Sequence, residues 1–278
     1  MSAVPRASSD TRPIGVFDSG LGGLTVASAI RRRLPDESII YLGDTARVPY
    51  GTRSSRTVLR YAKTCARTFM ADDVKAFVVA CNTVSAVALD TLRVELDVPV
   101  LGVVVPGAKA GLERSIVRRV GVLATPGTVA SGAYGRAIAS LDSRAEAVQR
   151  AAPLLVPLAE EGWLDGEVPE RVVERYLASF EGAGIDALVL GCTHSPLFRD
   201  TIERVGRRML HPSLAVADSA EALARTLASE LESRARAAEP GSDATLQVRV
   251  TDLPDRFEEV AARFFGEALG EVTAIDLR

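Results

Sequence analysis

Lysine is scarce in this sequence. Only three of the 33 basic residues are lysines, at Lys63, Lys75 and Lys109, and the rest are arginines. This scarcity leaves three candidates for a lysine that forms a Schiff base. None of the three lies in a recognisable cofactor-binding context, so the sequence gives no support to chemistry of that kind.

The sequence also lacks long apolar runs and a strong charge of one sign. No run approaches the roughly 18 apolar residues of a membrane span, and the polar N-terminal stretch MSAVPRASSDTRP has no apolar core like that of a signal peptide. The formal net charge of −3 offers no broad basic field to nucleic acid. We therefore expect no membrane partner and no direct nucleic-acid partner.

Cysteine is rare as well. Cys65, Cys81 and Cys192 are an odd set and lie far apart, which argues against a disulfide framework. Neither C-x-x-C nor H-E-x-x-H occurs, so no metal site and no thiol–disulfide enzyme is predicted. The simplest interpretation is a reduced, cytoplasmic protein with free thiols.

What the sequence does contain is the pattern of an α/β protein. With 47% apolar and 25% charged residues, the composition is that of a soluble globular protein. Short, continuous apolar runs alternate with amphipathic stretches, which indicates largely parallel sheets whose strands are buried on both faces. The predicted helices include 54–70, 171–180 and 220–237. The predicted strands are 14–17, 39–42, 76–80, 100–105, 120–124, 154–158, 187–190, 214–217, 246–250 and 272–277.

Ten strands are many for one sheet, so we expect two similar α/β domains. The segments 105–111 and 211–219 are the predicted crossings between them. The first domain is then predicted to comprise residues 1–105 plus 214–278, and the second to comprise residues 106–213.

One internal similarity links the two halves. VVACNTVSA (78–86) and VLGCTHSPL (189–197) align so that Cys81 matches Cys192, Asn82 matches Thr193 and Thr83 matches His194. Each cysteine follows a predicted buried strand and opens the next segment, where open α/β sheets bind ligands. Backbone N–H groups and a helix dipole there favour a thiolate. A lone cysteine is often a small buried apolar residue, and this is our interpretation of Cys65, but the matched pair favours function.

Other polar residues follow predicted strands. Asp18 ends the first strand in VFDSGLGG, where it either reaches a ligand or caps the next helix. This glycine cluster lacks the G-x-G-x-x-G spacing of a dinucleotide site, and no P-loop is present. His194 lies two residues after Cys192 and either moves a proton or makes a structural hydrogen bond. Of the adjacent Glu160 and Glu161, at most one should point inward.

Six blocks together resemble the glutamate racemases of the cofactor-independent aspartate/glutamate racemase superfamily. They occur in the family's order, run from Gly15 to about Ala220, and include both matched cysteines. The blocks are GVFDSGLGGLTV, YLGDTARVPYGTRS, VVACNTVSA, VLATPGTV, VPLAEEG and LVLGCTHSPL.

The resemblance implies two α/β domains related by a pseudo-two-fold axis, with the active site in the cleft between them. It implies racemisation of glutamate without a cofactor, D-glutamate for peptidoglycan, and a homodimer. Cys81 and Cys192 match the two catalytic thiols, and Asp18, His194 and Glu160 match the residues that assist them. The substrate-contacting positions match Asp18, Ser19, Tyr50, Gly51, Asn82, Thr83, Thr125, Thr128, Thr193 and His194.

Two positions of these blocks qualify the match. The family's T-x-x-T reads TPGT here, and Pro126 removes one backbone donor. In PLAEEG, Ala159 and Glu161 stand where other members vary, which leaves the choice between Glu160 and Glu161 open.

Racemisation needs a proton acceptor on one face of Cα and a donor on the other, which a thiolate and a thiol in facing domains supply. By resemblance, Cys192 takes the proton from L-glutamate and Cys81 takes it from D-glutamate. Helix N-termini and small polar side chains then stabilise the carbanion. Two alternatives stay open, namely a different substrate such as aspartate, a hydantoin or a maleate-type relative, and a non-enzymatic role in which the chain inhibits DNA gyrase.

Overall fold

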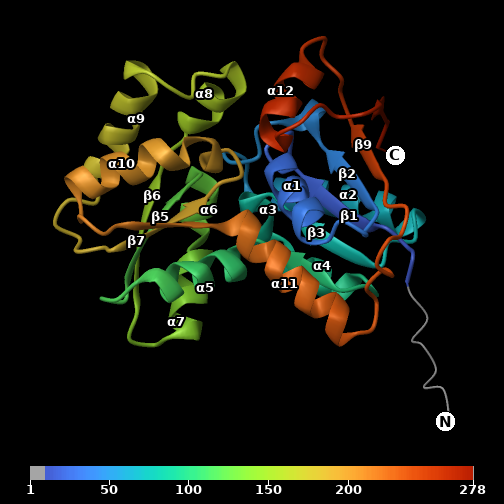
Figure 1. The fold of residues 1–278 in the computed structure, drawn as a ribbon, viewed down its shortest axis with the longest axis horizontal. Coiled ribbons are helices and arrows are strands. Elements are labelled where there is room, and N and C mark those ends of the chain that lie inside the picture. The colour runs from blue at the N-terminus through green and yellow to red at the C-terminus, as the bar shows by residue number, and fades with distance from the viewer. Residues whose placement is uncertain (1–9, 278) are drawn as a thin grey trace.

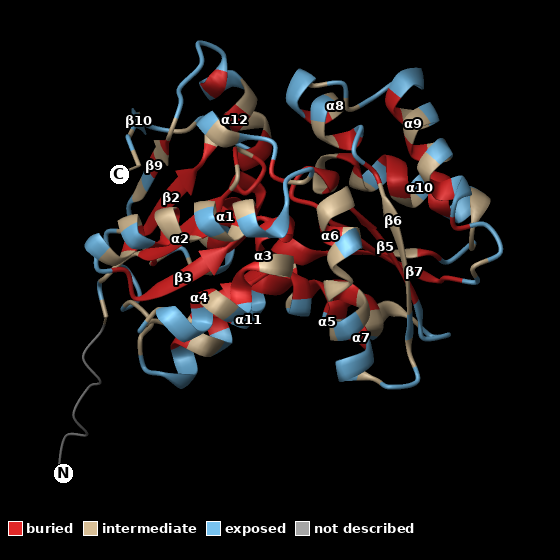
Figure 2. Ribbon diagram, turned by 180° about the vertical axis from the view of Figure 1, so that it is seen from behind, coloured by how far each residue is buried: buried red, intermediate tan, exposed pale blue. Residues whose placement is uncertain are grey.

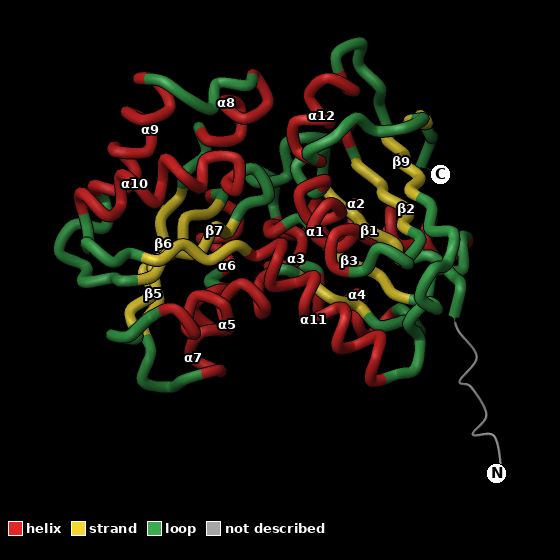
Figure 3. Tube along the Cα trace, viewed as in Figure 1, coloured by secondary structure: helices red, strands yellow, loops and turns green. Residues whose placement is uncertain are grey.

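The computed structural model describes residues 10–277. Most of the N-terminal stretch in which we predict no signal peptide therefore lies outside the described residues. Within residues 10–277, the helices are all too short or too polar to cross a membrane. The chain forms two lobes, each built on one parallel sheet enclosed by helices (Figures 1 and 3). The predicted fold class is confirmed.

The first lobe contains a six-stranded parallel sheet. Its strands, in spatial order, are β10 (Val272–Ala274), β9 (Leu246–Val250), β2 (Ile39–Gly43), β1 (Ile14–Asp18), β3 (Ala76–Val79) and β4 (Val100–Gly102). Its helices are α1 (Leu24–Arg33), the short 3₁₀ helix η1 (Thr45–Arg47), α2 (Ser55–Ala71), α3 (Asn82–Val87), α4 (Leu89–Glu95) and α12 (Phe257–Phe265).

The second lobe contains a four-stranded parallel sheet. Its strands, in spatial order, are β6 (Glu146–Ala151), β5 (Arg119–Ala124), β7 (Ala187–Gly191) and β8 (Ala215–Asp218). Its helices are α5 (Val104–Arg114), α6 (Pro126–Ser131), α7 (Ala133–Leu141), α8 (Leu155–Glu161), α9 (Glu167–Ala178), the 3₁₀ helix η2 (Ser195–Phe198) and α10 (Arg199–Met209). Helix α11 (Ser219–Ser233) runs back to the first lobe and packs against both α1 and α5 (Figure 1).

The two sheets repeat one topology. The order β2-β1-β3-β4 in the first lobe has the same form as β6-β5-β7-β8 in the second. Cys81 follows β3, and Cys192 follows β7, which is the equivalent strand. The internal similarity found in the sequence therefore corresponds to equivalent positions in two related sheets.

The strands β1, β2, β3 and β7 are buried along their whole length, as their continuous apolar sequences predict (Figure 2). Burial of these strands forms a core that continues from one lobe into the other. The two sheets are therefore rigid, and they hold the loops at their carboxyl ends in defined positions.

One strand was predicted in the wrong place. Residues 155–158 belong to a helix, α8, which Leu154 precedes as the N-cap and whose buried Leu155 and Ala159 are four positions apart on one face. The strand of this region is β6, which lies at the sheet edge and contains no fully buried residue. Its sequence EAVQRA is therefore too polar to stand out among the apolar runs.

Two predicted boundaries also differ from the structure. The strand predicted over 100–105 ends at Gly102, and α5 begins at Val104 with Pro106 in its first turn, where a missing N–H costs little. The strand β8 pairs with β7 of the second sheet, whereas the predicted return at residue 214 would assign it to the first domain. The sheet pairing supports a return to the first lobe after Asp218.

Candidate active site

A cavity of about 230 Å³ lies where the two lobes meet. Its walls come from loops and helix residues that follow β1, β2 and β3 in the first lobe and β5, β6 and β7 in the second. These loops lie at the carboxyl ends of parallel strands, which is where open α/β sheets bind ligands. The lining residues are Ser19, Gly20, Val48, Pro49, Tyr50, Gly51, Thr52, Thr83, Thr125, Pro126, Pro153, Val156, Pro157, Glu160, Cys192, Thr193 and His194.

Cys81 lies just behind this cavity wall. It is the N-cap residue of α3 and is buried, and Ser19 donates a hydrogen bond from Oγ to Cys81 Sγ at 3.3 Å. Burial, together with the nearby Asp18 carboxylate, raises the pKa of Cys81 to about 12, although the Ser19 hydrogen bond opposes this shift. At Cys81, desolvation therefore outweighs the effect of the N-terminus of the short α3 helix, where a backbone hydrogen bond from Val84 lowers the pKa.

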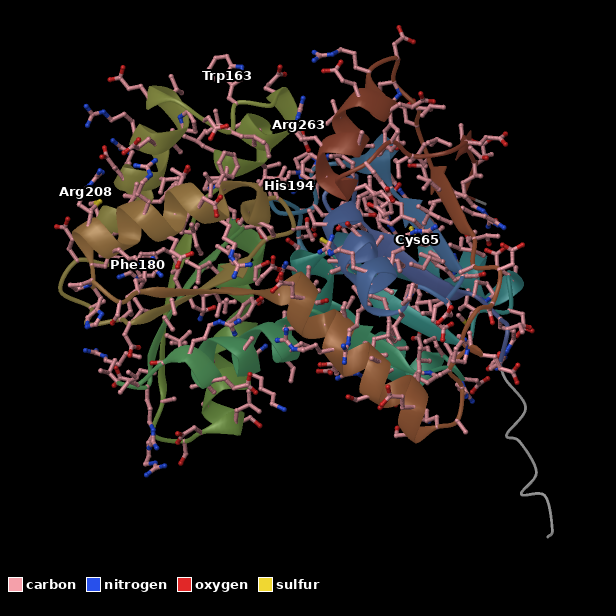
Figure 4. The ribbon with its side chains drawn as sticks, in the orientation of Figure 1. Cys65, Trp163, Phe180, His194, Arg208 and Arg263 are labelled. Carbon is pink, nitrogen blue, oxygen red and sulfur yellow. The ribbon has the colours of Figure 1, made fainter. Side chains whose placement is uncertain are left out.

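Cys192 lines the cavity from the second lobe, beside His194. The His194 ring lies at the junction of the lobes (Figure 4), with Nδ1 3.9 Å from Cys192 Sγ. Its Nε2 donates to Glu160 Oε1 at 3.0 Å. Burial lowers the pKa of His194, but the hydrogen bonds to Cys192 and Glu160 outweigh that effect and raise the pKa to about 10. The ring is therefore placed between a sulfur and a carboxylate, and its hydrogen bonds to both favour its protonated form.

The same geometry distinguishes the two adjacent glutamates. Both side chains are exposed to solvent, but Glu160 lines the cavity and contacts His194, whereas Glu161 does not line the cavity. The prediction that at most one of the pair points inward agrees with this arrangement.

Asp18 is fully buried at the end of β1. Its Oδ2 accepts a hydrogen bond from the N–H of Gly20 at 3.0 Å, and Oδ1 has no hydrogen-bond partner within residues 10–277. Burial raises the pKa of Asp18, and the charge of His194 partly opposes the shift. Helix α1 begins after Gly23 without a side-chain cap, so the alternative role of Asp18 as its cap is wrong.

Three threonines join the lobes beside the cavity. The Oγ1 atoms of Thr83 and Thr125 lie 2.9 Å apart, as do those of Thr125 and Thr128. Thr125 is also the N-cap of α6 and accepts from the N–H of Thr128. Thr128 is buried and does not line the cavity. Pro126 occupies the start of α6, where the N–H is unpaired in any helix, so the TPGT sequence is well suited to this turn.

Among the remaining residues predicted to contact the substrate, Tyr50, Gly51 and Asn82 each have a polar group that is hydrogen-bonded to another part of the protein. Tyr50 lines the cavity with its ring, while its hydroxyl donates to Asp44 Oδ2. The carbonyl of Gly51 accepts from the N–H of Gly127 at 2.8 Å. The buried Asn82 accepts from the hydroxyl of Tyr134 at 2.8 Å and does not line the cavity.

Sequence reasoning missed the apolar part of the wall. Val48, Pro49, Pro153, Val156 and Pro157 line the cavity although none of them offers a functional group. The only signal for them was their position after predicted strands, which they share with many loop residues.

Comparison with known proteins shows the family and the fold to which this chain is similar. The family described as Asp/Glu/Hydantoin racemase matches residues 24–227. A glutamate racemase of Geobacter metallireducens is 45% identical, over 96% of this chain and 97% of its own length. Among solved structures, the glutamate racemase isoform RacE1 of Bacillus anthracis has a TM-score of 0.90 at 36% identity, covering 96% of this chain and 98% of its own. Glutamate racemase of Francisella tularensis, solved in complex with D-glutamate, has a TM-score of 0.88 at 34% identity, with coverage of 96% and 98%.

The fold and the comparisons are those of a racemase, an isomerase that inverts a stereocentre. The chain belongs to the Asp/Glu/Hydantoin racemase family, within its group of glutamate racemases.

Proposed function

We propose that this protein interconverts L- and D-glutamate by a two-base mechanism in which Cys81 and Cys192 act on opposite faces of Cα. The observation that carries the proposal is the topological equivalence of the two cysteines. They follow equivalent strands of two facing sheets, one lining the shared cavity and one bonded to Ser19 in its wall. The relative from Francisella tularensis binds D-glutamate, which supports glutamate as the substrate.

The charges of the site set a starting state for the reaction. The His194 ring lies beside Cys192, whereas burial raises the pKa of Cys81 and so favours its thiol form. In the direction from L to D, Cys192 takes the Cα proton and Cys81 delivers its proton to the other face. The reaction leaves Cys192 as a thiol and Cys81 as a thiolate, so the reverse direction starts from the state that the forward direction produces.

The difficult intermediate is a carbanion beside a carboxylate. Hydroxyl groups of Ser19, Thr83, Thr125 and Thr193 lie in the cavity wall, where fixed donors stabilise developing negative charge. In a protein interior such donors are worth more than in water because the effective dielectric constant is lower. The D-glutamate formed is the enantiomer that we propose is supplied to peptidoglycan.

Deuterium incorporation at Cα in heavy water, followed by chiral separation, tests this mechanism. We expect Cys81→Ser and Cys192→Ser each to lower the rate of interconversion by at least ~10³-fold, because each removes one of the two bases. Cys65→Ala is the matched control, since Cys65 is buried in α2 outside the cavity, and it should retain activity. Full activity of either serine variant would contradict the two-thiol mechanism.

The same assay with enantiopure aspartate separates the two candidate substrates. We expect faster turnover of glutamate than of aspartate, and the reverse order would assign the chain to aspartate.

A further inference from the structure

Two consecutive residues of α12 reach the His194–Glu160 pair from the opposite lobe. Arg263 contacts the end of α8, which carries Glu160, and Phe264 contacts the ring of His194. Figure 4 shows Arg263 between α12 and α8, close to the junction at which His194 lies. None of the sequence motifs includes either residue.

Arg263 holds the backbone of α8. Its Nη1 donates to the carbonyl oxygens of Ala159 at 3.2 Å and Glu160 at 3.0 Å. The last carbonyls of a helix have no partner within the helix, and a cation there also suits the helix dipole. Gly162 ends α8 with a φ of +78°, and a Cβ at this position would lie 2.7 Å from Arg263 Cζ. The guanidinium therefore contacts the last turn of α8, which carries Glu160.

Phe264 holds the imidazole. Its ring is buried and packs edge-on against His194, with 5.0 Å between ring centroids and an interplanar angle of 75°. On another side Gly22 approaches so closely that a Cβ there would lie 2.5 Å from His194 Cε1. The ring is thus confined between two contacts from the first lobe, although its own backbone belongs to the second.

We propose that Arg263 and Phe264 are positioning residues for the proton-transfer site. Arg263 fixes the backbone of Glu160, and Phe264 fixes the plane of His194, so that Nε2 faces the carboxylate while Nδ1 faces Cys192. The consequence for turnover rests on the function proposed above. The arrangement also means that the geometry of a second-lobe base depends on a first-lobe helix.

A positioning role of Arg263 and a simple effect of its charge predict opposite changes in the pKa of His194 when Arg263 is replaced. The ionisable groups that act on His194 include Cys192, Glu160 and Asp18, and on α12 Arg263 itself pairs with Glu259 at 3.7 Å. Removing the positive charge of Arg263 alone would raise the pKa of His194, because one repelling cation is lost. Loosening Glu160 would lower the pKa, because the hydrogen bond that favours the cation is weakened. The sign of the change therefore separates the two explanations.

The experiment is an NMR titration of the imidazoles combined with kinetics. The chain has two histidines, so a His211→Asn background leaves His194 as the only imidazole signal. In that background we compare Arg263→Met, Arg263→Lys, Phe264→Leu and the control Arg256→Gln, which changes an exposed arginine preceding the same helix. Circular dichroism and thermal melts identify variants that fail to fold.

We expect Arg263→Met to lower the pKa of His194 by about one unit and to lower kcat by ~10- to 100-fold, as small displacements in active sites do. Arg263→Lys should restore most of both values, Phe264→Leu should lower kcat with the fold intact, and Arg256→Gln should change neither value.

An unchanged or raised pKa of His194 in folded Arg263→Met would overturn the proposal, as would equal losses in Arg263→Met and Arg256→Gln. The titration does not depend on turnover. A lowered pKa in a protein that does not racemise glutamate would therefore support the positioning role and reject the proposed function.

Discussion

At the scale of single residues, the site depends on groups whose protonation differs from that in water. Burial raises the pKa of Cys81 and of Asp18, whereas His194 is held as a cation by its hydrogen bonds to Cys192 and Glu160 despite burial. Groups with raised pKa values therefore lie close together in and behind the wall of one cavity. Such opposed shifts are typical of acid–base sites.

The raised pKa of His194 has a consequence for stability. Because the folded pKa of about 10 exceeds the ordinary histidine value of 6.5, the stabilisation is fully present below pH 6.5 and is lost as the pH rises towards 10. We expect the free energy of unfolding to fall between pH 6.5 and 9 by up to about 1.4 kcal/mol per pH unit. Urea unfolding across this window measures the slope, and the contribution of Cys81 begins only at higher pH.

His194→Asn should flatten that slope, whereas His211→Asn, which changes a residue outside the cavity, should leave it unchanged. An identical slope in His194→Asn and in the parent protein would contradict the assignment of the titration to His194.

At the scale of elements, the sequence predicted the strands best where both faces are buried. The apolar runs of β1, β3 and β7 stood out, and with them the loops that carry Asp18, Cys81 and Cys192. The edge strand β6 was missed because half-buried strands tolerate polar residues. The contribution of α12 could not be predicted, because a contact such as that between Phe264 and His194 is created only by folding.

The loop between β1 and α1 approaches the second lobe very closely at Gly22. A Cβ at Gly22 would lie 2.4 Å from Thr193 Oγ1 and 2.5 Å from two ring atoms of His194, so Gly22→Ala must displace the second-lobe loop. We expect a loss in kcat of about 10²-fold and a loss in stability of about 1–3 kcal/mol.

Glutamate turnover and urea unfolding measure these two effects. Gly270→Ala is the control, because a Cβ at Gly270 would meet open space. Unchanged turnover in Gly22→Ala would show that the lobes do not need this close approach.

At the scale of the whole molecule, long-range polar contacts join segments that are distant in the chain. The hydroxyl of Tyr134, in α7, contacts both Asn82 and Ser219, so one side chain of the second lobe touches α3 and the start of α11. On the far side of the first lobe, the buried Lys75 pairs with Glu37 at 2.5 Å and donates to the carbonyls of Asp10 and Arg236. Lys75, one of the three lysines of the chain, therefore has a structural role.

Lys75→Met should destabilise the protein by about 3–5 kcal/mol, because it leaves the buried Glu37 without its partner. The double variant Glu37→Leu with Lys75→Met should recover part of this loss, since no unpaired charge remains. Denaturant midpoints of the parent, single and double variants measure the coupling. A single variant as stable as the parent would show that the pair contributes little.

The pairing of β9 with β2 has a consequence for biosynthesis. These strands are neighbours in the first sheet but are separated by about 200 residues that include the whole second sheet. On the ribosome, the second sheet is therefore fully synthesised before the first can close. Because α12 follows β9, the helix that carries Arg263 and Phe264 emerges only after the whole second sheet, and its contacts with Glu160 and His194 form only then.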